Sequence, residues 1–139
     1  MIVIDTNVIS EVMKTSPSLA VLEWLNQQNS NSLFVSTITL GEIEYGLRIL
    51  PTGKRRHELK ERFEQFIFQA FRQRILVFDE AAARSYGEVM GHRKDLGRPM
   101  SVPDGQIAAI ARSKGFAIAT RNTSDFEECG FDLFNPFLY

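Results

Sequence analysis

The sequence has almost none of the residues that build disulfides or zinc sites. Its one cysteine, Cys129, excludes an internal disulfide, and its two histidines lack the spacing of a zinc site. It also lacks an excess of one charge: sixteen basic and seventeen acidic residues give a net charge of −1. The total charge therefore gives no sign of nucleic-acid binding, which usually appears as a basic excess.

Long apolar runs are absent as well. The opening run from Met1 to Ile4 is interrupted by Asp5 and has no basic residues before it, unlike a signal peptide or a membrane span. We therefore expect a cytoplasmic protein without membrane contact. With 44% hydrophobic and 24% charged residues, 139 residues are enough to bury one core. We predict a single domain over residues 1–139.

Short apolar runs alternate with helical patterns along the chain. Strands are predicted at residues 2–4, 33–36, 75–78, 116–119 and 131–134, and helices at 8–13, 19–25, 39–50, 59–71, 81–95 and 102–114. Continuously apolar strands that alternate with helices favour parallel pairing with both faces of the sheet covered. We predict an α/β fold, a three-layer α/β/α sandwich with a mainly parallel central sheet. The apolar tail from residue 135 to 139 should dock on it.

Four acidic residues fall near the end of a predicted strand or the start of a predicted helix: Asp5, Glu42, Asp104 and Asp125. Each has a structural explanation when taken alone. Asp5 fits an N-cap, and Asp125 fits a turn. The pairs Thr39 with Glu42 and Ser101 with Asp104 both match the capping box, in which the two side chains bond to first-turn amides.

Taken together, the four acids indicate a metal site. Ligand sites of parallel sheets lie beyond the carboxyl ends of the strands, and acids that converge there repel each other unless a cation lies between them. Mg²⁺ prefers such oxygen ligands, and it commonly promotes displacement at phosphorus. The neighbouring polar residues either orient a phosphate or a water, or are ordinary turn and cap formers: Thr6, Asn7, Thr120, Arg121 and Asn122.

Four stretches of the chain resemble, in order, the motifs of PIN-domain proteins. They are residues 3–10 (VIDTNVIS), 36–46 (STITLGEIEYG), 104–109 (DGQIAA) and 119–126 (ATRNTSDF), and the ending FNPF at 134–137 is similar to that of the FitB-like branch. The resemblance implies the PIN-type α/β/α fold. It also implies that Asp5, Glu42, Asp104 and Asp125 form the acidic quartet that serves RNA cleavage with Mg²⁺ or Mn²⁺. In this quartet, Asp5 and Asp104 would be the direct metal ligands.

The resemblance to the VapC type within that family also implies partners. These are an RNA substrate, with a loop of tRNA or rRNA favoured, and a VapB-like antitoxin that covers the acidic pocket and alone contacts operator DNA. A homodimer is expected as well. Scattered basic residues either flank the RNA path or are solvated helix faces: Lys54, Arg55, Arg56, Arg72, Arg74, Arg93, Lys94, Arg98 and Arg121.

Two other functions remain open at this point. Asp5-Thr6-Asn7 superficially resembles the opening Asp-x-Asp of haloacid-dehalogenase phosphatases, in which Asp5 would be the nucleophile, although Asn7 departs from that pattern. Alternatively, the chain is a catalytically silent module whose acids bind a metal or a partner's arginine.

Overall fold

The computed structural model describes all of residues 1–139 and has a parallel five-stranded sheet at its centre. The strand order is β3 (Ile75–Leu76), β2 (Leu33–Ser36), β1 (Ile2–Ile4), β4 (Ala117–Ala119) and β5 (Leu133–Phe134). Every neighbouring pair is parallel, and Val3 of β1 lies opposite Phe34 on one side and Ile118 on the other. The predicted parallel sheet is confirmed, with edge strands β3 and β5 shorter than the predicted runs.

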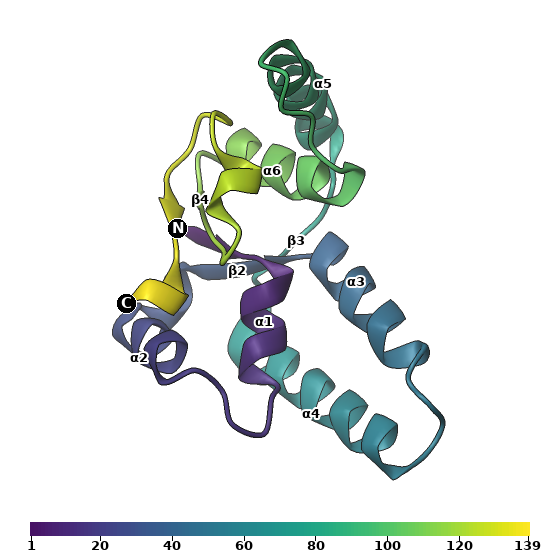
Figure 1. Cartoon of the computed structure of the whole chain (residues 1–139). Coiled ribbons are helices and arrows are strands. Elements are labelled where there is room, and N and C mark those ends of the chain that lie inside the picture. Colours follow the sequence, from purple (N-terminus) through teal and green to yellow (C-terminus); the bar gives the residue numbers. More distant parts are fainter.

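Helices cover both faces of this sheet (Figure 1). On one side lie α1 (Thr6–Val12), α2 (Leu19–Gln27), α3 (Thr37–Arg48) and α4 (Lys54–Phe71), and on the other lie α5 (Glu80–Asp95) and α6 (Val102–Lys114). Three short 3-10 turns complete the chain: η1 (Ser30–Ser32), η2 (Thr123–Phe126) and η3 (Pro136–Leu138). None of the helices combines the length and the apolar character that crossing a membrane requires.

The central strand β1 divides the interior into two cores. Ile2 and Ile4 pack with Val8 in the core beneath α1 to α4, whereas Val3 packs with Ile107 in the core beneath α6. Successive side chains of a strand point to opposite faces of a sheet, so a wholly apolar strand requires cover on both sides. The two cores confirm the predicted three-layer sandwich.

The start of α3 differs from the prediction, because the expected capping box from Thr39 to Glu42 is wrong. The helix begins at Thr37, and Ser36 is its N-cap, with Oγ accepting a hydrogen bond from the Thr39 amide at 3.1 Å. Ser36, the last residue of β2, has the extended backbone of an N-cap residue, which directs its hydroxyl toward the first-turn amides. Thr39 already lies inside the helix and therefore cannot be its cap. Glu42 consequently lies in the second turn of α3.

Of the other predicted capping box, the bond to the Ser101 hydroxyl is present. Ser101 is the N-cap of α6, and its Oγ accepts a hydrogen bond from the Asp104 amide at 3.3 Å. The C-terminal tail also docks as predicted. Phe137 packs against the core beneath α1 to α4, and Asn135 donates a hydrogen bond to the Arg121 carbonyl at 3.3 Å.

Candidate active site

Asp5 lies where β1 ends and α1 begins, at the carboxyl edge of the sheet. Its Oδ1 accepts a hydrogen bond from the Thr6 amide at 2.8 Å, which makes it the N-cap of α1. Its Oδ2 accepts from the Thr120 hydroxyl at 2.8 Å and from Asn7 Nδ2 at 3.2 Å. The side chain is only 5% exposed. The carboxylate is therefore held in one orientation by three donors.

The electrostatics of Asp5 show that other acids lie close to it. Its pKa is raised to about 6, mainly by burial and also by the charges of Asp104 and Glu42, whereas the hydrogen bonds from Thr120 and Thr6 act to lower it. Burial and nearby negative charge both disfavour an ionised carboxylate. A cation beside Asp5 would favour the ionised carboxylate and thereby lower its pKa.

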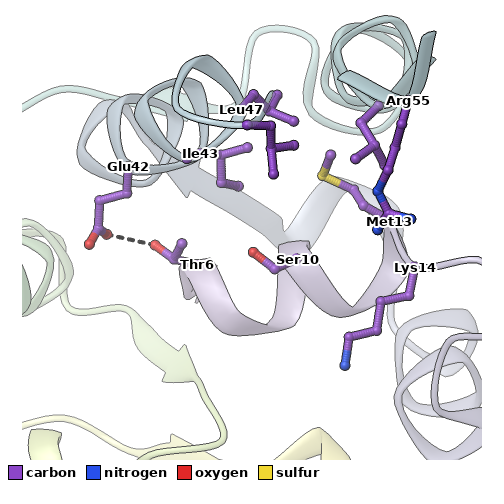
Figure 2. Close-up of a pocket in the computed structure, with 11 residues that line it drawn as sticks. Thr6, Ser10, Met13, Lys14, Glu42, Ile43, Leu47 and Arg55 are labelled. Atoms are coloured by element: carbon purple, nitrogen blue, oxygen red, sulfur yellow. Dashed lines mark hydrogen bonds between the residues drawn. The ribbon is translucent and has the colours of Figure 1, made fainter. Parts of the chain in front are cut away.

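Glu42 reaches this region from α3. Its Oε1 accepts a hydrogen bond from the Thr6 hydroxyl at 2.7 Å (Figure 2). The same Thr6 oxygen lies 3.0 Å from the buried Thr39 hydroxyl. The Glu42 side chain is otherwise exposed. Thr6 thus links α1 to α3 and turns Glu42 toward the end of β1.

Asp104 reaches the same region from the first turn of α6 and is half-buried. Burial raises its pKa, the bond with Ser101 opposes this, and the charges of Asp125 and Glu42 raise it again. Its position in the first turn also gives it the favourable end of the helix dipole. Asp104 is therefore close enough for its charge to interact with that of each of the other three acids, Asp5, Glu42 and Asp125.

A pocket of about 420 Å³ joins three of the four predicted acids, and no hydrophobic residue lines it. Its lining consists of Asp5, Thr6, Asn7, Ser10, Glu11, Lys14, Glu42, Asp104, Arg121 and Asn122. The fourth acid, Asp125, is exposed on η2 and does not line the pocket, although its charge reaches Asp104. No group of three or more Asp, Glu, His or Cys side chains is arranged as a metal site.

The predicted polar neighbours mostly hold the site together. Asn7 donates to Thr120 Oγ1 at 3.2 Å as well as to Asp5, and its Oδ1 accepts from the Arg121 amide at 3.1 Å. Thr120 is fully buried, and its Oγ1 accepts from the Asn122 amide at 3.1 Å. Thr120 therefore cannot touch a substrate in this arrangement and acts by positioning Asp5.

Sequence reasoning missed Glu11, a buried carboxylate in the wall of the pocket. It accepts hydrogen bonds from Lys14 Nζ and from the Ser18 amide, both at 2.9 Å, and lies 3.7 Å from Arg121 Nη2. These contacts, led by that with Lys14, lower its pKa. The available signal was helical spacing, because Asn7, Glu11 and Lys14 follow each other at i, i+4 and i+7. Glu11 thus holds two basic side chains beside the acids.

An apolar cleft of about 280 Å³ continues from the acidic pocket between α1, α3 and α4 (Figure 2). It shares Thr6, Ser10, Lys14 and Glu42 with that pocket. Its remaining lining is Met13, Ile43, Gly46, Leu47, Leu50, Arg55 and Leu59. A mixed surface of this kind suits a peptide segment that has both apolar and polar side chains.

The family follows from comparison with known proteins. The family model described as PIN domain matches residues 2–131. The chain belongs to the PIN domain family. A relative named VapC ribonuclease Y4jK, from Sinorhizobium fredii, is 46% identical over 136 residues, which cover 98% of this chain and 97% of the relative.

Solved structures of other PIN domain proteins match this fold closely. FitAcB from Neisseria gonorrhoeae has a TM-score of 0.93 and 37% identity, and the match covers all of both chains. A structure of FitAB bound to an IR36 DNA fragment has a TM-score of 0.92 and 38% identity over 99% of this chain and 96% of that one. The resemblance noted from the four sequence motifs is therefore confirmed. Membership of the PIN family replaces the alternative of a haloacid-dehalogenase phosphatase.

Proposed function

We propose that this PIN domain protein, a single domain over residues 1–139, is a metal-dependent endoribonuclease and the toxin of a toxin–antitoxin pair. The observation that carries the proposal is the acidic pocket. It places buried Asp5 with Glu42 and Asp104 at the carboxyl edge of a PIN-type sheet. The ribonuclease name of the relative at 46% identity supports the same activity.

The residues fit a hard divalent cation, Mg²⁺ or Mn²⁺. The available donors are carboxylate oxygens, and burial together with the charges of neighbouring acids raises the pKa values of Asp5 and Asp104. Mg²⁺ usually keeps several waters and takes one or two carboxylates, so Asp5 and Asp104 are sufficient to hold it. Bound there, the ion would supply an activated water and stabilise charge on the phosphate oxygens. Glu42, held by Thr6, would bind the ion or orient that water, and Asp125 would act from outside the pocket.

RNA is the substrate that the pocket favours. Lys14 and Arg121, held by Glu11, are basic side chains at its rim that can contact phosphates, and Asn7 and Asn122 are polar neighbours. Specific RNA recognition usually targets unstacked bases in loops, so we propose a structured loop of tRNA or rRNA. The test is to incubate total tRNA and rRNA with the protein freed of any antitoxin, in Mg²⁺, in EDTA, and in EDTA followed by excess Mg²⁺.

Discrete cuts that EDTA removes and Mg²⁺ restores are the expected result. Persistence of the cuts in EDTA would contradict the metal requirement. Absence of cuts in every RNA would favour the silent binding module instead.

The acids should differ in their effect on metal affinity. Because Asp104 lines the pocket with Asp5 and Asp125 does not, D104N should weaken Mn²⁺ binding by at least about tenfold, and D125N by much less. Calorimetric titration with Mn²⁺ measures both without any RNA. Equal losses in the two variants would contradict this division of roles.

We further propose that an antitoxin segment occupies the apolar cleft and extends into the acidic pocket. The continuity of the two cavities supports this, as do the similar structures of FitAcB and of FitAB on DNA. An arginine on that segment would pair with Asp5, Glu42 and Asp104 and block the site. Operator DNA would then be contacted by the antitoxin alone, and the toxin would form a homodimer within the complex.

Filling the cleft should release the protein from its antitoxin. Gly46 lines the cleft, and a Cβ built there meets no atom within 4 Å, so G46L places a side chain in the cleft without strain in α3. The inhibition constant of the antitoxin should rise by at least about tenfold, while cleavage of RNA without antitoxin is retained.

Gly91 provides the matched control, because it is an exposed glycine of α5 with equally open space. Leucine favours helix over glycine by up to about 1 kcal/mol, so both variants should fold at least as well as the parent. Equal inhibition of G46L, G91L and the parent would show that the antitoxin does not use this cleft.

A further inference from the structure

Arg93, in the last turn of α5, is the only basic side chain that the fold buries, and it is 4% exposed. It forms no salt bridge with any carboxylate. Its guanidinium instead donates to three backbone carbonyls: Nε to Arg98 at 2.7 Å, and Nη1 to Asp125 at 3.0 Å and to Glu127 at 2.8 Å. The sequence interpretation of Arg93 as a solvated face or a flank of the RNA path is therefore wrong.

Burial of a guanidinium is costly, and this position does not require one for packing. A charge removed from water destabilises the fold unless hydrogen bonds compensate it. Val89 and Ala82 occupy the same buried face of α5 and show that apolar side chains suit that face. The contacts of Arg93 with residues 125 and 127 are therefore the feature that needs a functional explanation.

Those contacts stabilise the η2 turn, which carries Asp125. The turn is a four-residue 3-10 helix whose N-cap, Asn122, makes no side-chain capping bond. Turns of this kind have weaker hydrogen-bond geometry than α-helices and need support from outside. Buried Phe126 anchors the turn from the core, and Arg93 holds the carbonyls on both sides of Phe126.

The same guanidinium is close to the acidic pocket. Its charge lowers the pKa of Asp104, opposing the larger raising effects of burial and of Asp125. Asp125 is exposed and does not line the pocket, so its position depends on the η2 turn that carries it. Arg93 thus donates a hydrogen bond to the backbone carbonyl of Asp125, and its charge acts on Asp104.

We propose that Arg93 is a positioning residue, whose buried guanidinium clamps the η2 turn and thereby fixes Asp125 relative to Asp104. The inference rests on the proposed nuclease function. Arg93 acts through the backbone and touches neither substrate nor metal. Lysine cannot replace it fully, because one ammonium cannot reproduce the planar fork that reaches carbonyls 98, 125 and 127 together.

The test is a double-mutant cycle between Arg93 and Asp125. R93M, which removes the donors but keeps an unbranched side chain, should lower kcat/KM by between about tenfold and about 100-fold, the cost expected for a misplaced catalytic group. In a D125N background the same change should lower kcat/KM by less than about threefold, because the carboxylate that Arg93 would position is already missing. Losses that multiply in the double variant would overturn the proposal, since they would show that Arg93 acts independently of Asp125.

R98A is the control within the same turn. Arg98 donates to the Ser124 carbonyl at 3.0 Å and pairs with Glu127 at 3.1 Å, but its side chain is 40% exposed, so water can replace its contacts. We expect its kcat/KM within about threefold of the parent. If R93M does not fold, R93K replaces it in the cycle, with a smaller loss of the same coupled kind.

Hydrogen exchange gives a readout that is independent of cleavage. Amides of residues 121–127 should exchange faster in R93M than in R98A, whereas exchange in the central strands stays unchanged in both. Unchanged exchange at residues 121–127 in R93M would overturn the clamp. If the parent protein cleaves no RNA, the proposed function fails, and this measurement still decides whether Arg93 holds the turn.

Discussion

An Asp5→Asn variant should lose RNA cleavage by about 10³-fold or more while it keeps its fold. Asp5 is the buried acid of the pocket, and its carboxylate charge is what would hold a divalent cation there. A loss of about 4 kcal/mol in stabilisation of the transition state corresponds to a factor of this size. The variant should be assayed with the parent in saturating Mg²⁺, and its fold should be checked by circular dichroism.

The asparagine has the same shape and can keep the cap. Its Oδ1 can still accept from the Thr6 amide, which preserves the cap of α1. Its Nδ2 replaces the oxygen that accepts from Thr120 and Asn7, so those two hydrogen bonds rearrange in the variant. Loss of cleavage without loss of fold therefore identifies a chemical role. Cleavage by D5N at the parent's rate would contradict the proposed site. Unfolding of D5N would instead show that Asp5 is needed for the fold as the cap of α1.

The metal-free protein should become less stable as pH rises from about 4 to about 6. The pKa of Asp5 is raised from 3.8 to about 6 in the folded state, so the folded chain holds a proton in this window that the unfolded chain has already released. The free energy of unfolding then falls as pH rises, by about 3 kcal/mol in total, and levels off above pH 6. Asp104 contributes in the same direction because its pKa is also raised.

Urea unfolding in EDTA across pH 4 to 8 measures this effect, with D5N as the matched control. The variant lacks the carboxyl group, so its decline with pH should be smaller, and at pH 7 in EDTA it should be more stable than the parent. Mg²⁺ should stabilise the parent more than D5N at pH 7, because a ligand that binds only the folded state stabilises it. An equal pH dependence in parent and variant would contradict the raised pKa of Asp5.

The cap formed by Asp5 is an example of what local sequence rules can predict. The rules offered two interpretations, a helix cap and a site residue, and the structure gives its side chain the geometry of a cap inside the acidic pocket. Asp104 likewise lies in the first turn of α6 behind the predicted cap Ser101. These predictions rested on residues near in sequence, for which hydrogen-bonding rules are strong.

Arg93 shows where those rules stop. It follows Val89 by four residues, so helical spacing placed it on the buried face of α5, but a charged residue in a basic pair is ordinarily read as solvated. Its carbonyl partners Asp125 and Glu127 lie more than thirty residues away along the chain. No local pattern indicates such a contact.

The sequence by itself determined the parallel α/β/α fold, the family and the four candidate acids, because strand burial, helix periodicity and motif order are encoded by neighbouring residues. Only the tertiary structure decided that Asp5, Glu42 and Asp104 share a pocket from which Asp125 is absent. It also decided that Thr120 bonds to Asp5 across 115 residues. Such relations depend on how separate elements pack, and packing is a property of the whole chain.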